Sequence, residues 1–110
     1  MKLGILNTSI VTSDGTYELT TIPTERAIAM VAFALTGDGI DSAVSHPSTA
    51  VILSEILGVE IPVNPQLFAQ QPGQAALVFK LNGRPANGVE LTREDLERIG
   101  FTFKVLRRLY

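Results

Sequence analysis

The chain has 110 residues, of which 45% are hydrophobic and 18% charged, which is typical of one folded domain with a single core. It has no cysteine and one histidine, which excludes disulfides, thiolate chemistry, the common zinc sites and a metal held by several imidazoles. Carboxylate-bound magnesium is not excluded by these counts, but we expect no resident metal and no cofactor. The net charge of −2 argues against binding of long DNA or RNA. No apolar run approaches the ~20 residues of a membrane span, so we expect a cytoplasmic protein.

The first part of the chain predicts two strands and a helix. A strand is expected over 2–11, and a turn signal at 14–15 leads to a second strand over 17–21, which favours an N-terminal hairpin. A helix is expected over 23–35, beginning at a proline. Its apolar residues point in several directions, so we expect it to be buried between layers or to face another subunit in part.

The rest of the chain alternates strands and helices. We expect strands over 40–44, 59–63, 75–81 and 101–109, a helix over 47–57 that ends at Gly58, and a short helix between the capping residue Thr92 and Gly100. The segment 82–88 is expected to be an exposed loop. This order predicts an α/β fold: a single domain over 1–110 with a mixed sheet of about five strands and helices packed on it.

The only histidine lies at the start of the helix expected over 47–57. Because Pro47 follows it, His46 should be extended and should immediately precede the helix. The amides of Ser48, Thr49 and Ala50 then point out of the helix N-terminus, where the dipole favours an anion such as a phosphate. His46 would be placed to act as a general acid in phosphodiester cleavage, although a packing or capping role is the simpler alternative.

Two other segments suggest hydrogen-bonding and cationic groups for the same site. Asn7, Thr8 and Ser9 interrupt an apolar strand, which costs free energy unless a partner satisfies the inward-facing groups; the alternative is a strand end that turns into solvent. Arg84 opens a rigid loop and matches a phosphate bidentately, and Lys80 alternates with apolar neighbours on the preceding strand. The alternative is that Arg84 is a solvated side chain in a surface turn and that Lys80 extends into solvent at a sheet edge.

These segments together resemble a known family. The stretches Leu6-Asn7-Thr8-Ser9-Ile10, Ser42 to Ala50, Leu53 to Asn64, and Arg84-Pro85-Ala86-Asn87-Gly88 are similar in order and spacing to the viral anti-CRISPR ring nucleases, a family first catalogued as a domain of unknown function in archaeal viruses and phages. The resemblance covers nearly the whole chain. Its most specific part is a histidine followed one residue later by Ser-Thr-Ala at the start of a helix that ends in Leu-Gly.

The resemblance implies a homodimer that binds cyclic tetra-adenylate, the second messenger of type III CRISPR systems, in a pocket across the two-fold axis. It implies metal-independent cleavage, in which a ribose 2′-hydroxyl attacks the adjacent phosphate and His46 protonates the departing 5′-oxygen. Arg84 matches the arginine that holds the ligand phosphate and Asn7 the asparagine near the nucleotide. The neighbouring Thr8, Ser9, Ser45, Ser48, Thr49 and Lys80 are the other residues expected to bind substrate.

Three residues depart from the family pattern. Ser45 stands where many members have glycine, and Pro65 replaces a common arginine. Asn87 stands where the family usually has a glutamate, before the glycine of the arginine loop, so the resemblance implies a place for it in the catalytic site with His46; an amide can orient a group but cannot accept a proton near neutral pH. Slower turnover is therefore expected, and two alternatives remain open: a module that binds and sequesters cyclic oligoadenylates, and a small dimeric interaction protein without a nucleotide ligand.

Overall fold

The computed structural model describes residues 1–84 and 90–110, and a five-stranded mixed sheet forms its centre. The strands β1 (Leu3–Leu6), β2 (Tyr17–Ile22), β3 (Ile40–Ser42), β4 (Ala75–Leu81) and β5 (Phe101–Arg108) lie in the order β2-β5-β4-β1-β3. The helices are α1 (Thr24–Leu35), α2 (Pro47–Leu57) and α3 (Arg93–Ile99). The predicted single α/β domain with a mixed sheet is confirmed.

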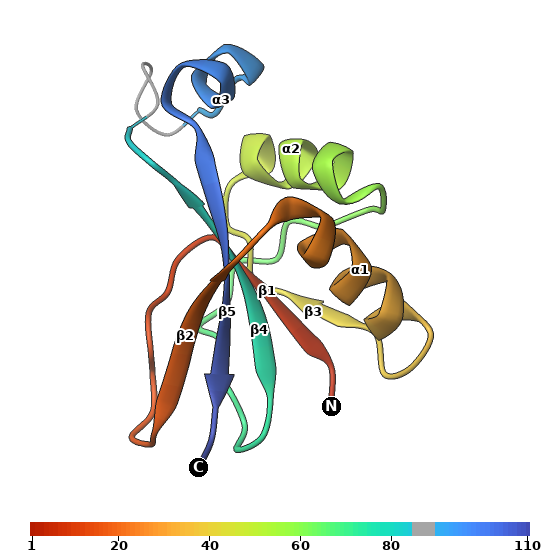
Figure 1. Ribbon diagram of the computed structural model, residues 1–110, viewed down its shortest axis with the longest axis vertical. Coiled ribbons are helices and arrows are strands. Elements are labelled where there is room, and N and C mark those ends of the chain that lie inside the picture. Colours follow the sequence, from red (N-terminus) through yellow and green to blue (C-terminus); the bar gives the residue numbers. More distant parts are fainter. Residues whose placement is uncertain (85–89) are drawn as a thin grey trace.

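The strand directions bring three carboxyl ends to one edge of the sheet. β1 runs parallel to both β3 and β4, whereas β5 runs antiparallel to β4 and β2. The carboxyl ends of β1 and β4 therefore lie at the upper edge in Figure 1, and both chain termini lie at the opposite edge. The predicted N-terminal hairpin is wrong: β1 is flanked on both sides by parallel partners, so β2 has no free edge there and pairs with β5 instead.

The predicted helices are confirmed, together with the residues that end them. Pro47 occupies the first turn of α2, and Gly58 ends this helix in the left-handed region with φ 74°. At α3 the backbone amide of Asp95 donates to the Thr92 hydroxyl at 3.1 Å, and the Thr92 amide donates back to the Asp95 carboxylate at 3.0 Å. This reciprocal pair is the expected capping box, closed by an aspartate.

The strand predicted over 59–63 does not form. Side chains of neighbouring elements hold this segment instead of a strand ladder: the Ile61 amide donates to the Ser54 hydroxyl at 2.8 Å, and the Ser42 hydroxyl donates to the Pro62 carbonyl at 2.6 Å. The Asn64 side-chain amide adds a bond to the Ser42 carbonyl at 2.8 Å. The segment therefore crosses the end of β3 as irregular but hydrogen-bonded chain, because the hydroxyls of Ser54 and Ser42 satisfy two of its backbone groups.

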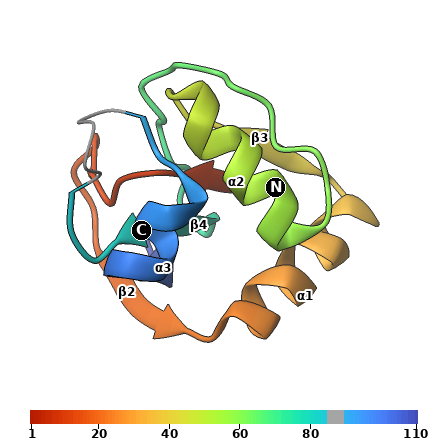
Figure 2. The same ribbon diagram turned by 90° about the horizontal axis from the view of Figure 1, so that it is seen from above.

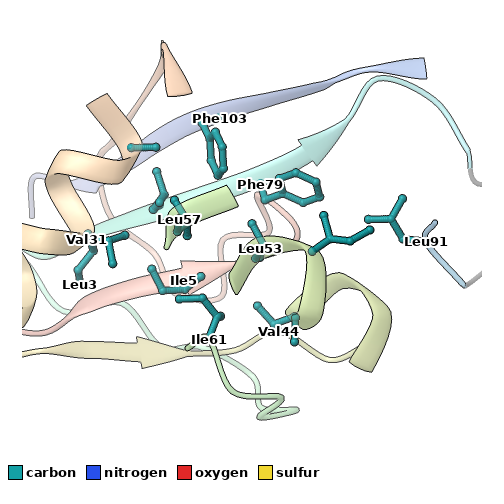
Figure 3. Packing of buried hydrophobic residues seen from close by; sticks show 14 residues of the cluster. Leu3, Ile5, Val31, Val44, Leu53, Leu57, Ile61, Phe79, Leu91 and Phe103 are labelled. Carbon is teal, nitrogen blue, oxygen red and sulfur yellow. The ribbon is translucent and has the colours of Figure 1, made fainter. Parts of the chain in front are cut away.

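All three helices contribute to one core on one face of the sheet. Strand residues such as Ile5, Phe79 and Phe103 pack there against Val31 of α1 and Leu53 of α2, as Figure 3 shows. Figure 2 gives the same helices from above, with α2 between α1 and α3. Burial of such side chains stabilises the fold by about 1.5–3 kcal/mol each.

Helix α1 is only half-buried, which corrects the expectation that it lies between layers. Ala27 and Val31 face the core, but Phe33 is 74% exposed, and Ile28 and Leu35 are also exposed. An outward apolar stripe therefore remains on this helix.

The opposite face of the sheet carries a smaller apolar cluster and no helix among the described residues. The irregular segment that follows α2 lays Phe68 over the strands, beside Leu6 and Val78. Gly4 makes this possible, because a Cβ atom at that position would lie 2.6 Å from Cζ of Phe68. The absence of a side chain in the middle of β1 thus shapes the surface next to its carboxyl end.

Candidate functional site

The polar segments that follow β1 and β3 meet at the carboxyl edge of the sheet. The two strands are parallel neighbours, with Ile5 opposite Ser42. Beyond them the side-chain amide of Asn7 lies 3.5 Å from the Ser45 hydroxyl, at the limit of a hydrogen bond. Two motifs 38 residues apart in the sequence are therefore adjacent in the fold, as the sequence predicted for a shared site.

A pocket of about 180 Å³ opens beside this contact, on the face of the sheet that carries no described helix. Its lining includes Asn7, Thr8 and Ser45, together with Gln66 and Phe68 from the segment after α2. Ser9 is exposed and is not part of this lining. The structure thus brings three of the predicted polar residues into one concave surface, with an apolar wall behind them.

Two residues that the sequence analysis missed hold the pocket walls in place. The Thr12 hydroxyl donates to the Phe68 carbonyl at 2.7 Å, which joins the loop after β1 to the loop after α2. The Gln66 amide donates to the Asp41 carboxylate at 2.9 Å and to the Ser42 carbonyl at 2.7 Å. Both residues sit in polar loops without a recognisable motif, so nothing in the sequence marked them.

His46 lies where the sequence placed it, directly before α2. Its backbone is extended, with φ −114° and ψ 128°, as expected for a residue that precedes proline. The side chain is exposed, caps no amide and has no hydrogen-bond partner among the described residues. His46 does not line the pocket itself, although its neighbour Ser45 does. The imidazole is therefore exposed next to a pocket-lining residue rather than inside the pocket.

The N-terminus of α2 offers two amides rather than three. The Ala50 amide donates to the His46 carbonyl at 3.1 Å, so its predicted availability to an anion is wrong. The amides of Ser48 and Thr49 have no partner in the described part of the chain. Together with the dipole of an 11-residue helix they form a small electropositive surface beside His46.

The side chains of Ser48 and Thr49 also take part in the packing of the fold. The Ser48 hydroxyl accepts the Leu91 amide at 2.9 Å, which ties the chain before α3 to the start of α2. The Thr49 side chain is only 7% exposed. Ser48 keeps its hydroxyl hydrogen for a ligand, and the backbone amides of both residues point out of the helix.

The predicted cations follow the neighbouring strand β4. Lys80 is exposed opposite Thr102 of β5, on the sheet face that holds Leu6 and Val78. Arg84 is exposed three residues after β4 ends and has no ion pair within the described ranges. Both belong to the same edge of the sheet as Asn7. Asn87 lies outside the described residues.

The described residues contain no group of three or more histidine, cysteine, aspartate or glutamate side chains that could hold a metal ion. None of their helices is long and apolar enough to cross a membrane.

The chain is similar to proteins of viruses and of a bacterium. The STIV B116-like family matches residues 3–103. The uncharacterized protein YddF of Bacillus subtilis (strain 168) is 34% identical over 110 residues, which is 99% of both chains. The uncharacterized protein ORF117 of Acidianus two-tailed virus is 36% identical over 69 residues, 62% of this chain and 59% of that one.

The fold has a counterpart among solved structures. B116 of Sulfolobus turreted icosahedral virus superposes with a TM-score of 0.79 over 98% of this chain and 100% of that chain. The two sequences are only 16% identical, so this likeness shows a shared fold.

Proposed function

The chain belongs to the STIV B116-like family, and from that premise we propose that it is a metal-independent ring nuclease. Its substrate is cyclic tetra-adenylate, the second messenger of type III CRISPR systems, and its linear products carry 2′,3′-cyclic phosphate ends. Removing the messenger shuts down the CRISPR ancillary effectors. The observation that carries the proposal is the exposed imidazole of His46 beside the Ser48 and Thr49 amides of α2, none of which has a hydrogen-bond partner among residues 1–84 and 90–110.

The reaction needs positioning and one proton donor rather than a protein nucleophile. The ribose 2′-oxygen attacks the adjacent phosphorus, the bond from phosphorus to the 5′-oxygen breaks, and the 2′-hydroxyl proton passes to solvent. His46 in its protonated form gives a proton to the departing 5′-oxygen, which leaves as a hydroxyl. The Ser48 and Thr49 amides stabilise the charge that develops on the phosphoryl oxygens.

The remaining residues of the site bind and orient the ring. Asn7 and Thr8 line the pocket with hydrogen-bonding groups that suit a base or a ribose, and Phe68 supplies an apolar wall. Arg84 and Lys80 supply positive charge for the phosphates from the same edge of the sheet. Correct placement of the 2′-oxygen lowers the barrier because the nucleophile already belongs to the substrate.

A homodimer is part of the proposal. The pocket of about 180 Å³ is below the 300–1,000 Å³ typical of small-ligand sites, so one chain encloses only part of a cyclic tetranucleotide. Its rim carries Ile10 and Leu67, which are 64% and 80% exposed. Apolar side chains at such a rim favour burial against a second copy, which would complete the cavity around a two-fold symmetric ligand.

The proposal is tested by turnover in the presence of a chelator. Wild type, His46→Ala and His46→Gln are incubated with cyclic tetra-adenylate, and products are separated by chromatography and identified by mass. Wild type is expected to give linear products, whereas both variants still bind the ring but cleave it about 10²–10⁴-fold more slowly, because general acid catalysis is lost. Equal rates for the three proteins would remove His46 from the mechanism.

A sequestering protein is the second candidate, and the amide at position 87 favours it. Without the carboxylate usual at that position, the site keeps its binding groups but loses one ionisable partner for the histidine. Tight binding of the ring by calorimetry, with the ring intact after long incubation with wild type, would select this alternative. No heat with any cyclic oligoadenylate would instead indicate a small interaction protein.

A further inference from the structure

Two pockets on the helix-bearing side of the sheet meet at Arg107. One, of about 410 Å³, lies between β2, β5 and the start of α1, and Arg26 contributes to its lining. The other, of about 300 Å³, lies at the amino ends of β1 and β4, with Lys2 in its lining. Arg107 lines both, and the two hollows on either side of it are here together called the Arg107 groove.

The groove gathers cations that the fold leaves unpaired. The chain has nine lysines and arginines. Four of these bond to described groups: Arg93, Arg98, Lys104 and Arg108. In the described part of the chain, five have no side-chain partner, and three of the five line this groove, namely Lys2, Arg26 and Arg107. The other two follow or belong to β4 at the candidate site.

Arg107 and Arg108, at the end of β5, have different surroundings because side chains alternate between the two faces of a strand. The Arg108 guanidinium donates to the Gln70 carbonyl at 2.6 Å and to the Asp14 carbonyl at 2.9 Å. Arg107 points to the other face, where Glu18 is its cross-strand neighbour, yet the two side chains form no ion pair. Opposite charges directly across two strands attract each other only weakly. The Arg107 guanidinium and the Glu18 carboxylate therefore both remain available to a ligand.

The walls add apolar surface to this charge. Ile22, Met30 and Val105 line the larger hollow, and Thr20 adds a hydroxyl. A volume of about 410 Å³ lies within the range of small-ligand pockets. Three cations against the single carboxylate of Glu18 suit a group with two or more negative charges, and the apolar wall suits an organic body attached to it.

We propose that the Arg107 groove binds an organic phosphate of nucleotide size. The phosphate oxygens accept from the guanidiniums of Arg107 and Arg26, with Lys2 as a further point charge. The organic body lies against Met30 and Val105, and Glu18 accepts a hydrogen bond from a ligand hydroxyl. The groove is separate from the candidate site, because it shares no lining residue with the pocket of Asn7 and lies on the opposite face of the sheet.

Amide NMR with a ligand that lacks adenine tests the position of the site. Uridine diphosphate is titrated into the ¹⁵N-labelled wild-type protein, with uridine and citrate as separate arms. Shifts are expected at the amides of Thr20, Val105 and Arg107 with uridine diphosphate, and no saturable shifts with uridine. Absence of saturation, shifts confined to Ser45 and Ser48, or citrate binding as tightly as uridine diphosphate would each overturn the proposal.

Charge-matched variants test the residues. Arg107→Gln and Arg26→Gln each remove one cation from the groove, and Lys104→Gln removes one from the opposite face. Each groove variant is expected to bind uridine diphosphate about tenfold more weakly or worse, since charge-assisted hydrogen bonds are lost. Lys104→Gln should bind within about twofold of wild type, and His46→Ala should bind normally. An equal loss in all four variants would mean general charge attraction and would refute the groove.

Discussion

Gly4→Ala is a direct test of how the sheet shapes the pocket. The new methyl would lie 2.6 Å and 2.9 Å from two ring atoms of Phe68 and 3.2 Å from the Cβ of Ala76, so the ring has to move. Displacing it exposes part of the cluster around Leu6 and loosens the pocket wall. Overpacking of this kind costs about 1–3 kcal/mol of unfolding free energy.

The same substitution should no longer lower the free energy of unfolding when the Phe68 ring is absent. Gly4 is not in a left-handed conformation, so alanine there only restricts the unfolded chain, which stabilises a protein by about 0.4–1 kcal/mol. The remaining contact with Ala76 reduces this gain. Phe68→Ala alone should cost roughly 2 kcal/mol, about half the value for a fully buried ring.

The assay is a double-mutant cycle measured by urea denaturation followed by circular dichroism. Gly4→Ala, Phe68→Ala and the double variant are compared with wild type, and their ligand binding is measured in parallel. We expect Gly4→Ala to be destabilising in wild type and nearly neutral in the Phe68→Ala background. If the two costs simply add, the ring is not what the methyl meets, and the account of the pocket wall is refuted.

Three further perturbations follow from single contacts. Ser48→Ala leaves the Leu91 amide without its acceptor, which should cost about 1–3 kcal/mol in urea denaturation; an unchanged midpoint would show that this bond does not anchor the chain before α3. Ser54→Ala removes the acceptor of the Ile61 amide, so hydrogen exchange of that amide, followed by NMR, should become faster; an unchanged exchange rate would contradict the role of Ser54. Acetylating the N-terminus removes the ammonium that lowers the pKa of Asp38 through its hydrogen bond and its charge. The Asp38 titration seen by NMR should then move up to the ordinary range. The small stabilisation of this exposed pair, present above the unfolded-state pKa and lost as pH falls through the lowered one, should vanish. No movement would show the pair to be absent in solution.

Local signals were sufficient to predict the helices and most strands. Pro47 and Gly58 bound α2 for stereochemical reasons that act within a few residues, and the Thr92 capping box does the same for α3. The partners of β1 were not predictable in this way, because parallel pairing joins residues far apart in sequence and leaves no turn signature. The prediction of a strand over 59–63 was wrong for a related reason, because the hydroxyl of Ser54 on another element accepts the Ile61 amide in place of a neighbouring strand.

The candidate site divides along the same line. Asn7 was predicted because polar residues interrupt an apolar strand, His46 because it precedes a proline at a helix start, and Ser45 only through the family resemblance; the sheet brings Asn7 and Ser45 together. Gln66 and Phe68 were missed because their roles arise only when an irregular segment folds over the end of β3 and across Gly4. Candidate chemical groups could be predicted from the sequence where the chemistry requires one residue type. The pocket wall could not be predicted, because only the packing of distant segments defines it.

The central claim is that His46 delivers a proton to the leaving oxygen of a bound cyclic tetra-adenylate. The most direct measurement is the single-turnover cleavage rate of wild type and His46→Ala with the ring fully bound and with excess chelator present. The account predicts linear products from wild type and a rate lower by at least about two orders of magnitude in the variant, with ring affinity retained. Cleavage by the variant at the wild-type rate, or an intact ring with both proteins, would contradict it.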